Sequence, residues 1–255
     1  MKLSGKVAIV TGSATGIGKA IATGMAAEGA AVVVDYVGAP DLANEVVSNI
    51  RSKGSNAMAF EADVSNPDQV NALVAQTIKT MGRLDIMVNN AGIESKHPFT
   101  EYPFELWQKV IAIDLTGPFL CAQAAAKAMI QQANGGRIIN ISSVHEDLPM
   151  PTNAPYCAAK GGLRMLMRTI AVELAPHNIT VNNIAPGAIY TPIDADVEAS
   201  KKSESTLMAE IPLGRWGKPE EVADLAIFLA SQAAGYCTGS TFFVDGGMIR
   251  QAGRL

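Results

Sequence analysis

Short apolar runs rich in β-branched residues recur along the whole chain, and most of them hold apolar residues at successive positions. Continuous runs of this kind are typical of parallel strands that are covered on both faces. We predict strands at 7–11, 31–35, 56–62, 84–90, 137–142, 179–185 and 241–245.

Longer stretches with helical character separate these runs. We predict helices at Gly16–Glu28, Asp41–Lys53, Pro67–Met81, Phe104–Gln132, Ala154–Ala175 and Pro219–Ser231. This alternation requires right-handed crossovers, which build a doubly wound parallel sheet with helices on both faces. Because no linker rich in Gly, Ser or Pro divides the chain, we expect a single α/β domain over residues 1–255.

The longest stretch without a clear sheet element follows the sixth predicted strand. It is rich in charged and small residues. A long insertion at such a place is often an active-site lid, and the alternative is a plain surface excursion. We predict a substrate lid at 188–213.

Composition and charge exclude several classes of protein. The chain has 255 residues, of which 48% are apolar, and a formal net charge of −4. Its longest basic cluster is Lys201–Lys202, which does not favour nucleic acid as a partner. The three cysteines are far apart, which suits a reducing compartment, and the histidines lack the spacing of metal ligands. The first apolar run is too short for a signal peptide or a membrane span, so we expect a cytoplasmic protein without a metal.

Glycines stand where the first predicted strand meets the first helix. The segment "VTGSATGIGKAI" contains Gly12, Gly16 and Gly18. Glycines allow a tight turn there and let backbone N–H groups approach a pyrophosphate, to which the helix N-terminus adds partial positive charge. The turn therefore predicts a dinucleotide site, and the alternative is a purely structural β–α turn.

The end of the second strand is where an adenosine ribose is expected. An acid there bonds the 2′-hydroxyl and repels a 2′-phosphate. Asp35 is close to that position, or one residue early, and is followed by Tyr36; no Arg or Lys occurs from residue 30 to 49. This charge pattern favours NAD over NADP, although Lys19 could still meet a phosphate. Asp63 and Val64 could edge the adenine, and "NNAG" (89–92) suits close approach of the cofactor.

Tyr156 and Lys160 are four residues apart in a predicted helix, so their side chains share one face. A tyrosine of ordinary pKa, near ~10, is a poor base at neutral pH. The Lys160 ammonium would lower that pKa, and Ser143, just past the fifth strand, could bond a substrate oxygen. The alternative is an interfacial tyrosine beside a solvated lysine. Together with a dinucleotide turn, the three residues predict transfer of a proton coupled to transfer of a hydride.

Several motifs along the chain together resemble those of the short-chain dehydrogenase/reductase family. The motifs are "TGSATGIG", "NNAG", Ser143 with Tyr156-x-x-x-Lys160, "NNIAPG" (182–187) and "VDGG" (244–247). The resemblance implies a Rossmann-type sheet of about seven strands, catalytic Ser143, Tyr156 and Lys160, and a homotetramer. It also implies that Lys160 bonds the nicotinamide ribose and that Ile189 and Thr191 bond the carboxamide. The full set of predicted cofactor-binding residues is Gly12, Ser13, Thr15, Gly16, Ile17, Gly18, Asp35, Tyr36, Asp63, Val64, Asn90, Ala91, Gly92, Tyr156, Lys160, Pro186, Gly187, Ile189 and Thr191.

One predicted catalytic position departs from the family pattern. The segment "IDLTG" (113–117) has Asp114 where the family generally has Asn. The family uses the main-chain carbonyl of this residue to hold a water beside the lysine, and a carbonyl survives the replacement. If Asp114 is ionised, its charge favours protonated Lys160.

A narrower resemblance concerns the substrate. The segments "NNAGIE" (89–94), "SSVHE" (142–146), "PGAIYTPIDAD" (186–196) and "IPLGRWGKPEEVA" (211–223) are similar to bacterial glucose 1-dehydrogenases. These oxidise β-D-glucose to glucono-1,5-lactone with NAD or NADP. The resemblance implies that Glu94 and His145, with Ser143, contact the sugar, since buried hydroxyls need hydrogen-bond partners. The alternatives are a surface glutamate and a solvated loop histidine.

Two other functions stay open. The segment "GGRIINISS" fits a carbonyl reductase acting on a 3-oxoacyl thioester or a small ketone equally well. A carrier-linked substrate would favour a basic patch, for which Arg164 and Arg168 are the candidates. A nucleotide sensor without catalysis would be expected to lack Tyr156 or Lys160, and both are present.

Overall fold

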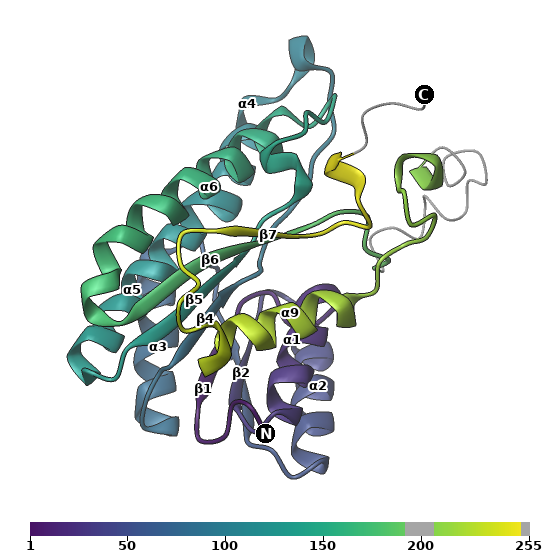
Figure 1. Cartoon of the computed structure of the whole chain (residues 1–255). Helices are drawn as coiled ribbons and strands as arrows, with labels where there is room; N and C mark the ends of the chain where they lie inside the picture. The colour runs from purple at the N-terminus through teal and green to yellow at the C-terminus, as the bar shows by residue number, and fades with distance from the viewer. Residues whose placement is uncertain (192–206, 251–255) are drawn as a thin grey trace.

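All seven apolar runs form strands of one parallel sheet (Figure 1). The computed structural model describes residues 1–191 and 207–250. The strands are β1 (Val7–Val10), β2 (Ala31–Tyr36), β3 (Ala57–Glu61), β4 (Ile86–Asn89), β5 (Gly136–Ile141), β6 (Ile179–Pro186) and β7 (Thr241–Val244). Their order in the sheet is β3-β2-β1-β4-β5-β6-β7, and every neighbouring pair is parallel. The predicted Rossmann-type fold is confirmed.

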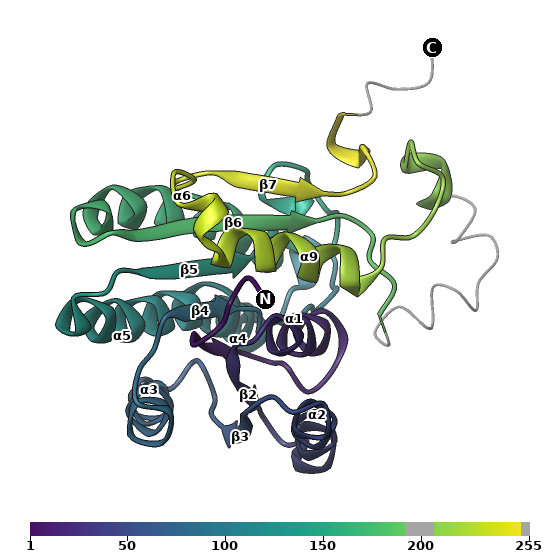
Figure 2. The same ribbon diagram turned by 60° about the horizontal axis from the view of Figure 1, so that its bottom comes forward.

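Helices cover both faces of the sheet (Figure 2). One face carries α1 (Gly16–Ala27), α2 (Pro40–Ser52) and α9 (Pro219–Ala230). The other carries α3 (Pro67–Met81), α5 (Gly117–Gln132) and α6 (Ala154–Leu174). Two separate hydrophobic layers therefore enclose the sheet.

The central strands supply side chains to both layers. Ala8 and Val10 of β1 belong to the layer under α1, whereas Ile9 between them belongs to the layer under α3 and α5. Successive side chains of a strand point to opposite faces, so a strand covered on both sides must be apolar at every position. This explains the continuous apolar runs of the sequence.

The order of the strands reverses between β1 and β4. The chain runs outward from β1 to β2 and β3, then crosses back to place β4 on the other side of β1. Segments that follow β1 and β4 therefore leave the sheet in opposite directions and open a crevice at its carboxyl edge. Asn90, after β4, spans this point and donates from Nδ2 to the main-chain oxygens of Thr11 (2.9 Å) and Gly12 (3.1 Å).

The helix predicted over Phe104–Gln132 is interrupted, so that prediction is corrected. α4 (Phe104–Ile111) is followed by a π-helical turn at Ala112–Thr116, after which α5 begins. Pro118 has no N–H and cannot donate to the carbonyl of Asp114 in the α-helical pattern, which favours the wider turn. Single π turns are frequent at functional sites, and this one contains Asp114.

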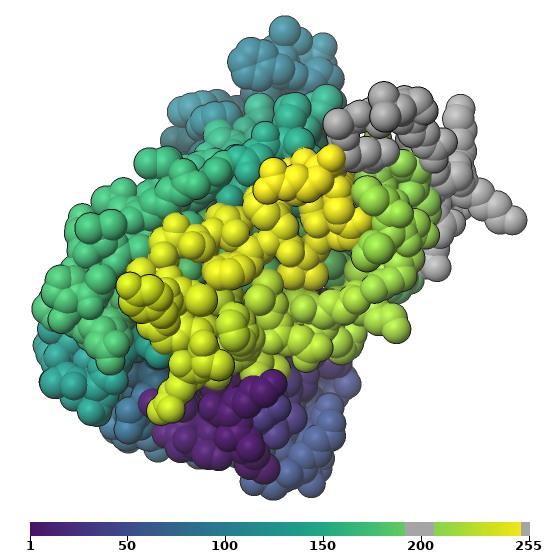
Figure 3. Space-filling view, viewed as in Figure 1, coloured from purple at the N-terminus to yellow at the C-terminus, as the bar shows by residue number. Residues whose placement is uncertain are grey.

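The predicted lid at 188–213 is described only at its two ends, because residues 192–206 lie outside the described part of the chain. A parallel bridge joins Ile189 to Gly217. Leu213 donates its N–H to the carbonyl of Gly246 at 3.1 Å, which brings the light-green segment beside the yellow C-terminal one in Figure 3.

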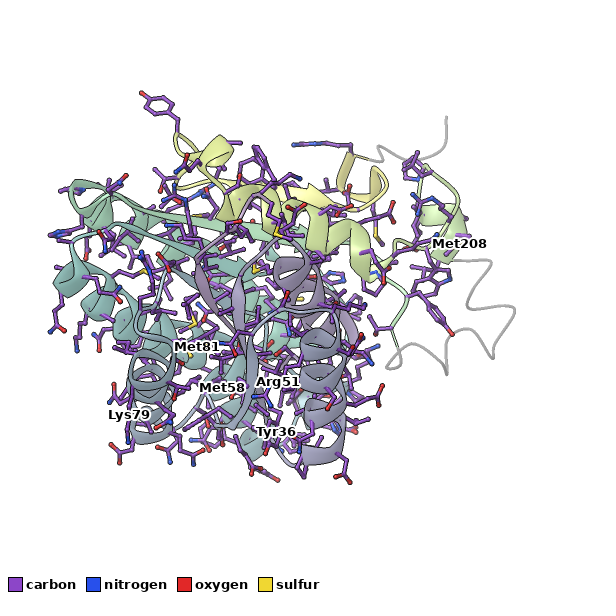
Figure 4. The ribbon with its side chains drawn as sticks, turned by 90° about the horizontal axis from the view of Figure 1, so that it is seen from below. Tyr36, Arg51, Met58, Lys79, Met81 and Met208 are labelled. Carbon is purple, nitrogen blue, oxygen red and sulfur yellow. The ribbon has the colours of Figure 1, made fainter. Side chains whose placement is uncertain are left out.

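The sheet edge at β3 is held by α2. Arg51 donates from Nε to the carbonyl of Ala57 at 2.9 Å, and both Arg51 and Met58 are labelled in Figure 4.

Within residues 1–191 and 207–250, no helix combines the length and the apolar character needed to cross a membrane.

Candidate active site

The turn between β1 and α1 has the form of a phosphate cradle. Gly12 and Gly16 have φ of +61° and +55°, a region that disfavours residues with a Cβ. A Cβ on Gly18 would lie 2.5 Å from Nδ2 of Asn90 and 2.6 Å from the oxygen of Gly12. Thr15 caps α1 without a side-chain hydrogen bond to the helix. These features fit a pyrophosphate bound by the first backbone N–H groups of α1.

Asp35 points into the fold. Its side chain is buried, Oδ2 accepts the N–H of Gly12 at 3.2 Å, and its main-chain oxygen accepts the N–H of Ser13 at 2.8 Å. Burial raises the pKa of Asp35 to about 8. Through its bond with Gly12, the Asp35 carboxyl group supports the glycine turn from inside. The strand end is occupied by Tyr36 and by Val37, which is 65% exposed.

Ser13 and Asp63, two more of the predicted cofactor residues, form side-chain hydrogen bonds with residues close in the sequence. The Ser13 hydroxyl donates to the carbonyl of Val10 at 2.7 Å. Oδ1 of Asp63 accepts the N–H and the hydroxyl of Ser65 at 2.9 and 2.7 Å. Ser13 is fully buried and its N–H already donates to the carbonyl of Asp35, so neither its hydroxyl nor its N–H is free for a cofactor, whereas Asp63 keeps its second carboxylate oxygen.

The segment after β6 lies opposite the glycine turn. A Cβ on Gly187 would come within 2.9 Å of Cα of Asp245, so Gly187 allows close packing against the segment after β7. Ile189 is buried. A Cβ on Gly16 would lie 3.8 Å from Thr191, so the predicted carboxamide side and the predicted phosphate side of the crevice are near each other.

The structure brings Ser143, Tyr156 and Lys160 together. Ser143 follows β5, and its Oγ accepts the N–H of His145 at 3.1 Å. Tyr156 and Lys160 lie in the first turns of α6, with the ammonium 5.2 Å from the centre of the Tyr156 ring. Lys160 also donates to the carbonyl of Ile141 at 3.2 Å, which ties α6 to the end of β5.

The pKa of Tyr156 is raised above its usual value. Burial is the main cause, and it outweighs the lowering by the Lys160 ammonium and by a hydrogen bond with Ser143. The negative charges of Glu94 and Asp114 raise this pKa further. The lowering by Lys160 agrees with the sequence prediction, and burial acts more strongly in the opposite direction.

Asp114 and Lys160 form a buried ion pair. Oδ2 of Asp114 lies 3.2 Å from Nζ of Lys160, and their side chains are 0% and 5% exposed. Oδ1 of Asp114 accepts the N–H of Ile93 at 2.9 Å. Burial lowers the pKa of Lys160, but Asp114 and Tyr156 raise it by more. The lysine is therefore held protonated by the carboxylate that replaces the family's asparagine.

Glu94 and His145 lie on the rim of this cluster. The His145 ring meets Tyr156 edge-on, with centroids 6.3 Å apart, and its Nδ1 lies 3.2 Å from the carbonyl of Leu148. Oε2 of Glu94 accepts from Nδ2 of Asn153 at 3.3 Å. Asn153 is fully buried, and its Oδ1 has no hydrogen-bond partner. The rim thus gathers several polar groups next to the tyrosine.

The sequence reasoning missed Asn153 and Glu146. Asn153 stands at the N-cap position of α6, three residues before Tyr156, and an Asn before a predicted helix was its available signal. Glu146 is buried four residues after Ser142, where a glutamate was expected at the surface.

Within the described parts of the chain, no group of three His, Cys, Asp or Glu side chains could hold a metal ion.

Residues 12–249 match the family model described as enoyl-(acyl carrier protein) reductase, a model of short-chain dehydrogenases/reductases. The chain belongs to the short-chain dehydrogenase/reductase family. It is accordingly an oxidoreductase enzyme of a family that binds NAD(P).

Other members of the short-chain dehydrogenase/reductase family match nearly the whole chain. Glucose 1-dehydrogenase 2 of Bacillus subtilis is 44% identical, over 96% of this chain and 95% of the relative. A 3-oxoacyl-(acyl-carrier-protein) reductase of Synechocystis is also 44% identical, over 97% of this chain and 98% of the relative. The crystal structure of a gluconate 5-dehydrogenase from Burkholderia cenocepacia in complex with NADP and tartrate has a TM-score of 0.93 and 37% identity, and the match covers 98% of each chain. Relatives named for different substrates thus have similar sequence identity to this chain.

Proposed function

We propose that the protein oxidises a sugar with a nicotinamide cofactor, and specifically β-D-glucose at C1 to glucono-1,5-lactone. The observation that carries this proposal is the polar rim beside Tyr156, where Glu94, His145 and Asn153 gather. A sugar presents several hydroxyls, and each needs a partner when it is buried. The similarity to a glucose 1-dehydrogenase supports the same substrate.

The three central side chains would divide the chemistry. Bound NAD(P) supplies the carbon that accepts the hydride. Oγ of Ser143 would hold the substrate oxygen, and Oη of Tyr156 would take its proton as general base. The Lys160 ammonium favours the phenolate, and Asp114 partly offsets that effect. In the reverse direction, Tyr156 returns the proton to the same oxygen.

NAD is the proposed cofactor. The end of β2 presents exposed Val37, and no Arg or Lys occurs from residue 30 to 49 to bind a 2′-phosphate. Lys19, on the first turns of α1, has its ammonium 3.6 Å from the Glu45 carboxylate. The gluconate 5-dehydrogenase relative carries NADP, so the preference has to be measured.

The second candidate function is reduction of a carbonyl group, such as a 3-oxoacyl thioester or a small ketone. The Synechocystis relative favours it. Of the two basic residues that a carrier-linked substrate could use, Arg164 is already paired with Glu146 and Asp147, which leaves the exposed Arg168. A sensor without catalysis is not retained, because the family is one of oxidoreductases.

The first experiment measures initial rates with D-glucose, with NAD and NADP in parallel, from the absorbance of the reduced nicotinamide. Turnover supports the sugar assignment, and the ratio of the two kcat/KM values decides the cofactor. Absence of turnover with both cofactors would contradict the glucose proposal. A panel of ketones and 3-oxoacyl thioesters with NADH and NADPH would then test the second candidate.

The Glu94→Gln variant is expected to lose about ten- to a hundredfold in kcat/KM for the sugar, the size of a lost hydrogen bond to a charged group. An apolar ketone does not need this carboxylate, so its reduction should change much less. Glu101→Gln, on an exposed turn, is the matched control. Equal losses for sugar and ketone would remove Glu94 from the sugar site.

The Asp114→Asn variant is expected to move the acidic limb of the pH profile for alcohol oxidation to lower pH. The Asp114 charge raises the pKa of Tyr156, so its removal lowers that pKa and the phenolate forms at lower pH. Asn keeps an oxygen for the N–H of Ile93. The measurement is kcat/KM against pH, with Asp224→Asn on the exposed side of α9 as control. A limb that stays in place or moves upward would contradict the role of the ion pair.

Apolar side chains exposed on α4, α5 and α6 support the expected homotetramer. They are Phe104 (68% exposed), Phe119 (41%), Met165 (57%) and Val172 (76%). Further copies of the chain would cover them. Light scattering on the purified protein tests the assembly.

A cytoplasmic location suits three cysteines that are all unpaired.

A further inference from the structure

A buried glutamate outside the Ser–Tyr–Lys cluster holds the turn that carries Ser143. The side chain of Glu146 is 0% exposed, and its carboxylate is bonded from several directions. Oε2 accepts from the hydroxyl of Ser142 (2.6 Å) and Nδ2 of Asn183 (3.2 Å), and Oε1 accepts from the hydroxyl of Thr241 (2.7 Å). A buried carboxylate is stable only with such partners, so their positions and its own fix each other.

The partners of Glu146 come from the segment after β5 and from β6, β7 and α6. Ser142 follows β5, Asn183 belongs to β6 and Thr241 to β7. Arg164 of α6 places its Nε 3.5 Å from Oε1 of Glu146. Arg164 lies one helical turn after Lys160, so the carboxylate links the Ser143 turn to the helix that carries Tyr156 and Lys160.

A row of asparagines extends this network across the sheet. Asn89, Asn140 and Asn183 stand opposite one another on β4, β5 and β6. Nδ2 of Asn89 donates to Oδ1 of Asn140 (2.8 Å), and Nδ2 of Asn140 donates to Oδ1 of Asn183 (2.9 Å). Asn183 then donates to Glu146. The carboxylate is thus the acceptor at the end of a buried chain of hydrogen bonds that begins next to the cofactor crevice.

The Glu146 backbone also closes the turn around the serine. Its N–H donates to the main-chain oxygen of Ser143 at 3.0 Å, while the N–H of His145 donates to Oγ of Ser143 at 3.1 Å. The hydroxyl of Ser142 is held by the Glu146 carboxylate. The main chain is therefore fixed on both sides of Ser143.

We infer that Glu146 is a positioning residue, whose buried carboxylate holds the Ser143 hydroxyl in place relative to Tyr156 and Lys160. The inference rests on the proposed roles of Ser143 and Tyr156 and is independent of which alcohol or carbonyl compound is the substrate. Loss of the carboxylate leaves three donors without their acceptor and Arg164 with Asp147 as its remaining partner, and the serine turn then shifts.

The test is a double-mutant cycle between Glu146→Ala and Ser143→Ala, using whichever substrate the unmodified protein turns over. Glu146→Ala is expected to lower kcat about 10- to 100-fold, as for a small misplacement of a reacting group, with little change in the Kd for NADH. In the Ser143→Ala background the same change should lower kcat by much less, because the group that Glu146 positions is already gone. Equal fold-losses in both backgrounds would overturn the inference.

A second variant and a substrate-free measurement accompany the cycle. Glu146→Gln keeps the volume and one acceptor oxygen, and it takes the place of the alanine variant if that protein does not fold. Hydrogen exchange of the amides in segment 142–148 should be faster in both variants. Asp147→Asn, whose carboxylate pairs with Arg164 but is 30% exposed, is the matched control and should leave exchange and kcat unchanged. Unchanged exchange in the Glu146 variants would also overturn the inference.

Discussion

Replacement of Tyr156 by Phe is expected to lower kcat by roughly 10²- to 10⁴-fold, the range that a positioned acid–base group contributes. The phenyl ring keeps the edge contact with His145 and the position beside the Lys160 ammonium. Loss is therefore confined to the hydroxyl, which takes or returns the proton of the substrate oxygen. Fluorescence titration with NADH should give a Kd close to that of the unmodified protein.

The matched control for this variant is Tyr236→Phe, because Tyr236 is fully exposed. Its kcat and its NADH affinity should both be unchanged. Turnover of Tyr156→Phe within a few fold of the unmodified protein would show that another group is the base. A large loss of NADH affinity would show instead that the variant damages the cofactor site.

Replacement of Lys160 by Met is expected to remove activity and also to destabilise the fold by about 3–5 kcal/mol. Breaking a buried pair by removing one partner leaves an uncompensated charge, and Asp114 is fully buried. Activity falls because the ammonium no longer favours the phenolate of Tyr156. Chemical denaturation and initial rates measure the two effects separately.

The double variant Lys160→Met with Asp114→Asn separates stability from catalysis. It removes the orphaned charge, so the free energy of unfolding should recover while turnover stays lost. The loss in free energy of unfolding of the single variant Lys160→Met should also depend on pH. Burial raises the pKa of Asp114 in the folded state above the usual 3.8, so the deficit is small below that value and grows as pH rises towards the folded-state pKa. A deficit that is independent of pH, or no recovery in the double variant, would contradict this account of the ion pair.

Most of the fold could be predicted because the sheet is covered on both faces. Ile9 and Val10 pack against opposite layers, so strand β1 reads as one unbroken apolar run. The helix over Phe104–Gln132 was predicted without a break because apolar residues continue through Ala112–Thr116. The break depends on Pro118, whose missing N–H is a single-residue signal.

The central side chains could be predicted because their geometry is local. Tyr156 and Lys160 are one turn apart on a helix, and that spacing alone places them together. The orientation of Asp35 could not be predicted in this way, since it depends on how the glycine turn folds back over β2. Glu146 could not be predicted either. Its partners Asn183 and Thr241 are 37 and 95 residues away in the sequence, and only the assembled sheet brings them to it.

The bridge between Ile189 and Gly217 bears on how far the connection between them can vary in length. The chain leaves the sheet after β6 and returns to its own starting point, with the N–H of Tyr190 bonded to Gly217 and that of Gly217 bonded to Ala188. Doubling the length of a closed loop costs only about 0.6 kcal/mol of chain entropy. Ile211 is buried and Leu213 is bonded to Gly246, so residues near the second anchor are also fixed to the fold. A change of length farther from the anchors therefore costs little free energy and leaves the sheet and Tyr156 in place.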